Sequence, residues 1–153
     1  MTIIFGLGNP NRCDDAVGLM ILDALRAMDL PAGVQLRHHL GDGMGLVNAL
    51  AETHHAIICD AVRGGQPGQL VTLDCSQALL PEQPFMSSSH GFGLAEAVEM
   101  ARVMNMLPPK CFIVGVYVAS LTTGYAVSQP VQDAIPASVQ WITRHLDLDL
   151  LHG

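Results

Sequence analysis

Three observations predict an α/β protein, a three-layer α/β/α sandwich around a mostly parallel five-stranded sheet. Strand-like and helix-like segments alternate along the chain, which is typical of parallel strands joined by crossover helices. Residues 2–5 are β-branched or aromatic throughout, as a strand buried on both faces requires. Residues 17–28 repeat apolar side chains at the spacing of an amphipathic helix. The chain is therefore expected to open with a strand, a loop and a helix.

The same patterns predict the remaining elements. Strands are expected over residues 34–38, 55–59, 69–73 and 111–118, and helices over residues 44–53, 93–106 and 130–145. Only a short loop precedes strand 69–73, so we expect an antiparallel strand at one edge of the sheet. Strand 111–118 is almost entirely apolar, which favours a central position. Pro136 is expected to kink or divide the last helix, and residues 147–153 to form a frayed tail.

Size and composition bound the possible functions. Residues 1–153 have the length of one ordinary domain. Seven Lys plus Arg against fourteen Asp plus Glu give a formal charge of −7 without a basic cluster, so nucleic acid is not an expected partner. No apolar stretch has the length of a membrane span, and no secretory signal pattern is seen, so a cytoplasmic location is expected. The four cysteines contain no C-x-x-C pair and are expected to be free thiols.

Side chains with metal-binding chemistry stand at the ends of the predicted elements. Asp14 and Asp15 are expected at the first turn of the first helix, Asp60 follows the third strand, and His90 ends the long loop before the third helix. Ligands bind beyond the carboxyl ends of the strands in an open parallel sheet, so we expect Asp15, Asp60 and His90 to converge there. Two carboxylates and one imidazole can bind a divalent cation such as nickel or zinc and leave coordination positions open.

Each of these residues also has a local structural explanation. Asp15 could cap its helix, Asp60 could stabilise a turn, and His90 or Ser89 could cap the helix that follows them. Such local roles are the commoner ones for single residues of these types. Their joint occurrence at one predicted edge of the sheet favours the metal site. Strand alternation is expected to turn Cys59 to the face opposite Asp60.

Four motifs around these residues occur in one order along nearly the whole chain. They are Gly8-Asn9 with Asp14-Asp15-x-x-Gly18, then Ile57-Ile58-Cys59-Asp60-Ala61, then Ser89-His90-x-x-x-Leu94, and then Gly115-Val116 with residues 124–131. Together they resemble the nickel-iron hydrogenase maturation endopeptidases. The resemblance implies an enzyme that removes the C-terminal extension of a hydrogenase large-subunit precursor after nickel insertion. It further implies that Asp15, Asp60 and His90 contact nickel presented by the precursor, and that no Ser or Cys acts as nucleophile.

One segment departs from the pattern of that family. Many members carry an Asp-Gly-Gly-like motif at the end of the second strand, where this chain reads RHHLGDGMG over residues 37–45. Asp42 could substitute from a shifted loop, His38 and His39 could add imidazoles at the same edge, or the glycines could form only a tight turn. The catalytic residues are therefore left open, with Asp14, Asp42 and His38 as candidates for a supporting role.

Two other functions are compatible with the sequence. A noncatalytic recognition or chaperone module could bind a nickel-loaded metalloenzyme precursor without cutting it, because no residue stands out as a nucleophile. Residues 6–10, GLGNP, also resemble the opening of bacterial peptidyl-tRNA hydrolases. That family needs a catalytic His soon after this motif, whereas the first His here is His38, and an acidic chain repels tRNA. The oligomeric state is left open, with a monomer as the default.

Overall fold

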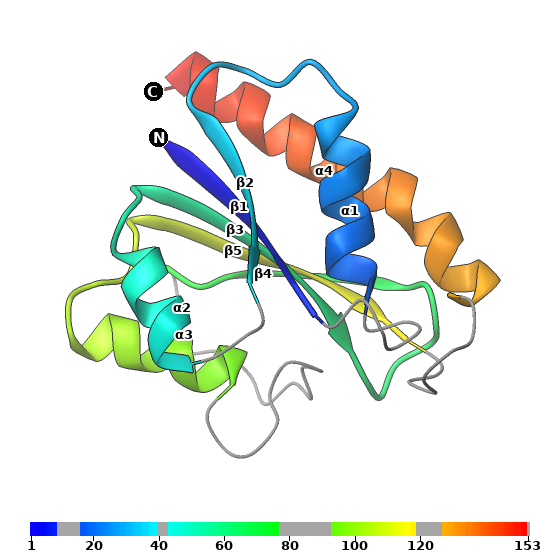
Figure 1. The fold of residues 1–153 in the computed structure, drawn as a ribbon, viewed down its shortest axis with the longest axis horizontal. Helices are drawn as coiled ribbons and strands as arrows, with labels where there is room; N and C mark the ends of the chain where they lie inside the picture. The colour runs from blue at the N-terminus through cyan, green and yellow to red at the C-terminus, as the bar shows by residue number, and fades with distance from the viewer. Residues whose placement is uncertain (9–15, 40–42, 77–92, 119–126, 153) are drawn as a thin grey trace.

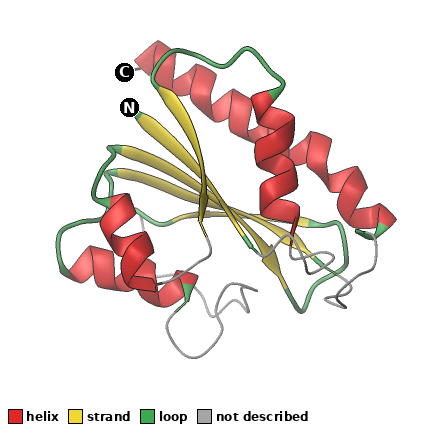
Figure 2. Cartoon of the chain, viewed as in Figure 1, coloured by secondary structure: helices red, strands yellow, loops and turns green. Residues whose placement is uncertain are grey.

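The computed structural model describes the chain except for residues 9–15, 40–42, 77–92, 119–126 and 153, and it gives only the backbone helix for residues 147–152. One sheet with helices on both faces is formed (Figures 1 and 2). The elements in chain order are β1 (Thr2–Leu7), α1 (Val17–Arg26), β2 (Val34–His39), α2 (Gly43–Leu50), β3 (His55–Val62), β4 (Leu70–Asp74), α3 (Leu94–Val103), β5 (Lys110–Tyr117) and α4 (Gln129–His152).

The sheet has the strand order β2-β1-β3-β5-β4. Strands β2, β1, β3 and β5 are parallel, and β4 pairs antiparallel with β5 at one edge. The predicted fold class, including the antiparallel edge strand, is confirmed. Strand β5 is an interior strand, but β3 holds the middle position, because the short β4 extends the sheet beyond β5 by a single strand.

Two apolar cores lie on the two faces of the sheet. Helices α2 and α3 cover one face, and helices α1 and α4 cover the other (Figure 1). Strand β1 contributes to both cores, with Phe5 and Leu7 under α2 and α3, and Ile4 under α1 and α4. A strand with neighbours on both faces must be apolar on both, which explains its uninterrupted apolar sequence.

Several predicted boundaries differ from the structure. Helices α2 and α3 each end three residues earlier than predicted, at Leu50 and Val103. Strand β3 continues beyond residue 59 to Val62, because Asp60, Ala61 and Val62 keep the parallel pairing with β5. Helix α4 is one helix of 24 residues with Pro136 inside it, and its backbone is helical to His152 rather than to residue 145. Packing of its apolar face against the sheet compensates the hydrogen bond that the proline removes.

None of the helices, over the residues that the structure describes, combines the length and the apolar character needed to cross a bilayer.

Candidate functional site

Asp60 lies inside β3, near the carboxyl end of the middle strand. It pairs with Gly115 of β5, and the ladder continues through Ala61. Its side chain is 0 % exposed, and Oδ1 accepts a hydrogen bond from the backbone N–H of Ala61 at 2.9 Å. Burial of a carboxylate opposes folding unless surrounding groups compensate the charge. Because Asp60 is a strand residue, the turn role that the sequence allowed is wrong, and a functional role is favoured.

Helix α1 has Ala16 at its N-cap. This residue makes no capping hydrogen bond through a side chain, and the first helical residue is Val17. Asp14 and Asp15 lie outside the described residues. The capping role that the sequence allowed for Asp15 therefore lies outside the described residues as well.

Helix α3 begins in a comparable way, with Gly93 at the N-cap. The backbone N–H of Gly93 donates to Oε2 of Glu96 at 3.1 Å, so the helix supplies part of its own cap. Ser89 and His90 lie outside the described residues and precede this cap in the sequence. The N-cap of α3 is thus Gly93 rather than Ser89 or His90.

The three-residue metal site stays a prediction. Of Asp15, Asp60 and His90, only Asp60 is among the described residues, and the supporting candidate Asp42 also lies outside them. Within the described ranges, no group of three or more His, Cys, Asp or Glu side chains is arranged to hold a metal ion.

The start of α1 packs directly on the ends of β1 and β3. A Cβ atom added to Gly18 would lie 2.4 Å from the carbonyl oxygen of Leu7 and 2.7 Å from that of Cys59. A Cβ atom added to Gly6 would lie 2.6 Å from the carbonyl oxygen of Gly18. Only glycines allow this approach, which holds the first turn of α1 against the residue that precedes Asp60.

His38, near the end of β2, is hydrogen-bonded to the backbone of the residue that follows β1. Its Nε2 lies 3.1 Å from the carbonyl oxygen of Gly8, and because a carbonyl can only accept, the ring N–H donates. Gly8 has a φ of +131°, a conformation that favours glycine. His38 therefore supports the backbone immediately before the segment that carries Asp14 and Asp15.

His39 shares a face of the sheet with Asp60. Side chains alternate along a strand, and Arg37, two residues earlier, places its guanidinium carbon 5.8 Å from the centre of the Phe5 ring, in the core under α2 and α3. Asp60 is two residues before Val62, which belongs to the same core. The half-buried His39 is thus turned to the face of Asp60. The sequence alone could not decide which of the two adjacent histidines, His38 or His39, lies on that face.

The described cysteines are buried free thiols, as predicted. Cys59 lies in the core under α1 and α4, on the face opposite Asp60, as strand alternation predicted. Burial, and secondarily the charge of Asp60, raise the pKa of Cys59 to about 12. The hydrogen bond that the protonated Cys111 shares with Cys75, and burial, raise the pKa of Cys111 well above its ordinary value. A thiol acts as a nucleophile through its thiolate, so neither Cys59 nor Cys111 is activated.

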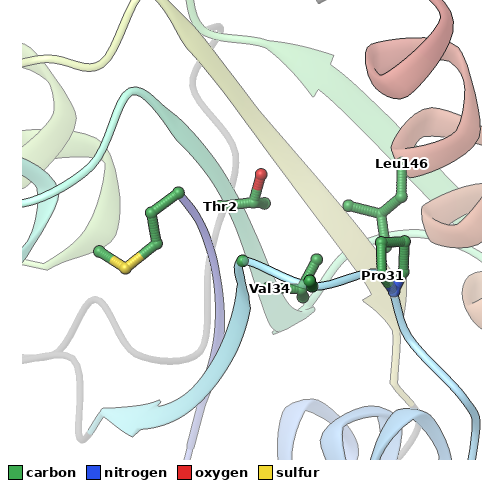
Figure 3. Close-up of a pocket in the computed structure, with 7 residues that line it drawn as sticks. Thr2, Pro31, Val34 and Leu146 are labelled. Atoms are coloured by element: carbon green, nitrogen blue, oxygen red, sulfur yellow. The ribbon is translucent and has the colours of Figure 1, made fainter.

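Two surface cavities lie at the opposite edge of the sheet. One, of about 180 Å³, is lined by residues at the amino ends of β1 and β2 together with Leu146 (Figure 3). The other, of about 210 Å³, is lined by Met1, Thr2, His54, His55, Pro109 and Lys110. Both are separated from Asp60 by the length of the strands, so neither is the site that the polar residues predict.

Comparison with known proteins gives a consistent result. A family model described as HycI, hydrogenase maturation protease, matches residues 41–145. The hydrogenase 2 maturation protease of Escherichia coli strain K12 is 28 % identical over 145 residues, which cover 92 % of this chain and 87 % of that protein. The structure of the hydrogenase maturating endopeptidase HybD from E. coli has a TM-score of 0.81 at 26 % identity and covers 97 % of this chain and 93 % of its own. A solution structure of an endopeptidase from E. coli has a TM-score of 0.76 at 27 % identity, over 93 % of this chain and 90 % of its own.

Proposed function

Because this chain belongs to the hydrogenase maturation protease family, we propose that it is an endopeptidase that removes the C-terminal extension of a nickel-iron hydrogenase large-subunit precursor. Two relatives named as a hydrogenase maturation protease and a hydrogenase maturating endopeptidase match nearly the full length of the chain, which supports this activity. The same comparisons favour a protease over the peptidyl-tRNA hydrolase alternative and over a module that binds without cutting.

We further propose that the precursor docks through its own nickel ion, onto Asp15, Asp60 and His90. The observation that carries this proposal is the fully buried Asp60 near the carboxyl end of the middle strand. Gly93 supports it, because this residue holds the N-cap of α3 for which His90 was the competing candidate. Carboxylate and imidazole ligands suit a divalent ion of borderline character, and three of them leave positions for the ligands of the precursor.

In this proposal the nickel belongs to the substrate, and the protease uses it to position the peptide. Holding the nickel fixes the neighbouring peptide bond beside the protein, which makes its hydrolysis effectively intramolecular. The described cysteines Cys59 and Cys111 are protonated and buried, so they support attack by water rather than by a thiolate.

The test is intact-mass analysis of a nickel-loaded large-subunit precursor incubated with the protein, with the nickel-free precursor alongside. We expect loss of a C-terminal peptide only from the nickel-loaded form. Asp15→Asn, Asp60→Asn and His90→Gln are expected to abolish that loss. Asp23→Asn is the matched control, because Asp23 is an exposed carboxylate that pairs with Arg26 on α1. Binding without any loss of mass would support the noncatalytic module, and equal cleavage of both precursor forms would disprove docking through nickel.

A further inference from the structure

We propose that His39 is a catalytic residue of this peptidase, the group that accepts the proton of the attacking water. The inference rests on the proposed function, because it assigns a role within the same site. It begins from the two adjacent histidines at the end of β2, which the structure places on opposite faces of the sheet.

Strand pairing puts His39 level with Asp60. Gly6 of β1 pairs with His38 on one side and with Cys59 on the other. The next residue of each strand is therefore in line across the sheet, with His39 and Asp60 on either side of Leu7. Neighbouring strands lie about 4.8 Å apart, so the two Cα atoms are separated by about 10 Å.

Both side chains belong to the same face at that level. Leu7 and Val62 lie in the core under α2 and α3, and alternation from Arg37 and from Val62 turns His39 and Asp60 to this face. Leu7, which lies between them in the sheet, is fully buried in this core. A precursor docked through Asp60 would thus lie beside the half-buried imidazole of His39.

The chemistry of the site requires a proton acceptor. Cys59 faces away from Asp60 and keeps its proton, and Asp60 is assigned to the nickel of the precursor. Among side chains, imidazole is the one that most readily accepts and returns a proton near neutral pH. Within the part of the chain that the structure describes, the imidazole of His39 is turned to the face of Asp60.

The step balances without a further reactant. A ring nitrogen of His39 accepts a proton from water as the water oxygen bonds to the scissile carbonyl carbon. The carbon–nitrogen bond then breaks, and the imidazolium returns the proton to the departing amine. The products are a new carboxyl terminus and the released peptide, and the side chain regains its starting state.

The test is single-turnover cleavage of the nickel-loaded precursor over a range of enzyme concentrations, which separates the maximal rate from the half-saturating concentration. We expect His39→Ala and His39→Gln to lower the maximal rate by about a hundred- to ten-thousand-fold and to leave the half-saturating concentration unchanged. Gln35→Ala is the matched control, because Gln35 lies on the same strand and face but away from the carboxyl edge. Thermal unfolding of each variant verifies folding, and His39→Gln decides the result if His39→Ala does not fold.

Free imidazole supplies a readout that a structural role would not move. It is expected to restore part of the cleavage rate of His39→Ala and none of the cleavage rate of Asp60→Asn. The wild type in the same buffer shows how far free imidazole slows cleavage by binding the nickel itself. A wild-type rate in His39→Gln, or a change confined to the half-saturating concentration, would overturn the inference while the proposed function stands. Absence of cleavage by the wild type would instead remove the proposed function itself.

Discussion

His38 and Gly8 are joined by a hydrogen bond that extends the pairing of β2 with β1 by one step. The backbone register of these strands ends at Leu7 and His39, whereas Nε2 of His38 reaches the carbonyl oxygen of Gly8 at 3.1 Å. Gly8, the last described residue after β1, is thus held by a side chain of the neighbouring strand β2. This bond gives His38 a positioning role at the carboxyl edge, distinct from the role proposed for His39.

Replacement of His38 by alanine removes this bond. We expect the free energy of unfolding to fall by about 1 kcal/mol, the net value of a typical hydrogen bond. The half-saturating concentration for the precursor should rise, because the backbone before Asp14 and Asp15 is no longer held. Urea unfolding and single-turnover cleavage measure the two effects. His38→Gln keeps an N–H donor and should recover part of both, and a His38→Ala protein identical to the wild type in both assays would refute the positioning role.

Replacement of Gly18 by alanine tests the contact between α1 and the strand ends. The new Cβ would meet the carbonyl oxygens of Leu7 and Cys59, which are backbone atoms and cannot rotate away. Such overpacking costs up to about 3 kcal/mol, more than the roughly 1 kcal/mol that alanine gains over glycine in a helix, so we expect a net loss of about 2 kcal/mol in urea unfolding. Gly33→Asn is the control, because a Cβ on Gly33 meets nothing within 4 Å and asparagine tolerates its φ of +88°. Equal stability of Gly18→Ala and the wild type would mean that the junction relaxes without cost.

Asp60→Asn separates stability from activity. The amide oxygen can still accept the hydrogen bond from the N–H of Ala61, and the buried charge disappears. We therefore expect the free energy of unfolding to stay within about 1 kcal/mol of the wild type, or to exceed it, while cleavage is lost. Thermal unfolding and intact-mass analysis of the precursor check the two halves of the prediction. Collapse of the fold in this variant would show that the charge itself holds the sheet together.

The pKa of Cys59 predicts a dependence of stability on pH. The thiol ionises near 9 in the unfolded chain and at about 12 in the folded protein, so the folded state binds more protons between these values. The contribution of Cys59 to stability is therefore intact below pH 9 and declines by roughly 1.4 kcal/mol per pH unit from 9 towards 12. Cys59→Ala should lose this part of the slope in urea unfolding measured across that range. Superimposable slopes for the two proteins would contradict the burial of the thiol.

The same burial predicts the chemical behaviour of this thiol. Iodoacetamide at pH 8 is expected to leave Cys59 unmodified in the native protein and to alkylate it in urea, as peptide mass analysis would show. Native alkylation at this position would indicate that β3 opens locally.

The fold could be predicted from the sequence because each helix and strand has a recognisable local pattern of apolar residues. The alternation of apolar strands and amphipathic helices indicates parallel strands with crossovers, and the short loop before β4 indicates an antiparallel neighbour. The end of β3 could not be predicted in this way. In the sequence, Asp60 has the pattern of the first polar residue after a strand. Only its pairing with Gly115 of β5 shows that the strand continues.

The site was predictable in its residue types and less so in its geometry. Asp60 was identified from its position after an apolar strand. The structure places it near the carboxyl end of β3, with Cys59 on the opposite face of the sheet. The choice between His38 and His39 depends on how β2 aligns with β1. That register is set by contacts distant in sequence, so no local pattern could reveal it.

The complete enclosure of Asp60 has a consequence for metal selectivity in the cell. A carboxylate without contact to solvent does not meet the free cations that surround the protein, and a loose ion gains too little from one ligand to displace what packs around it. A nickel ion already fixed in a folded precursor arrives together with the binding energy of that protein's surface. In the docking mode proposed above, the protease would therefore respond to an ion held by the precursor and not to dissolved metal.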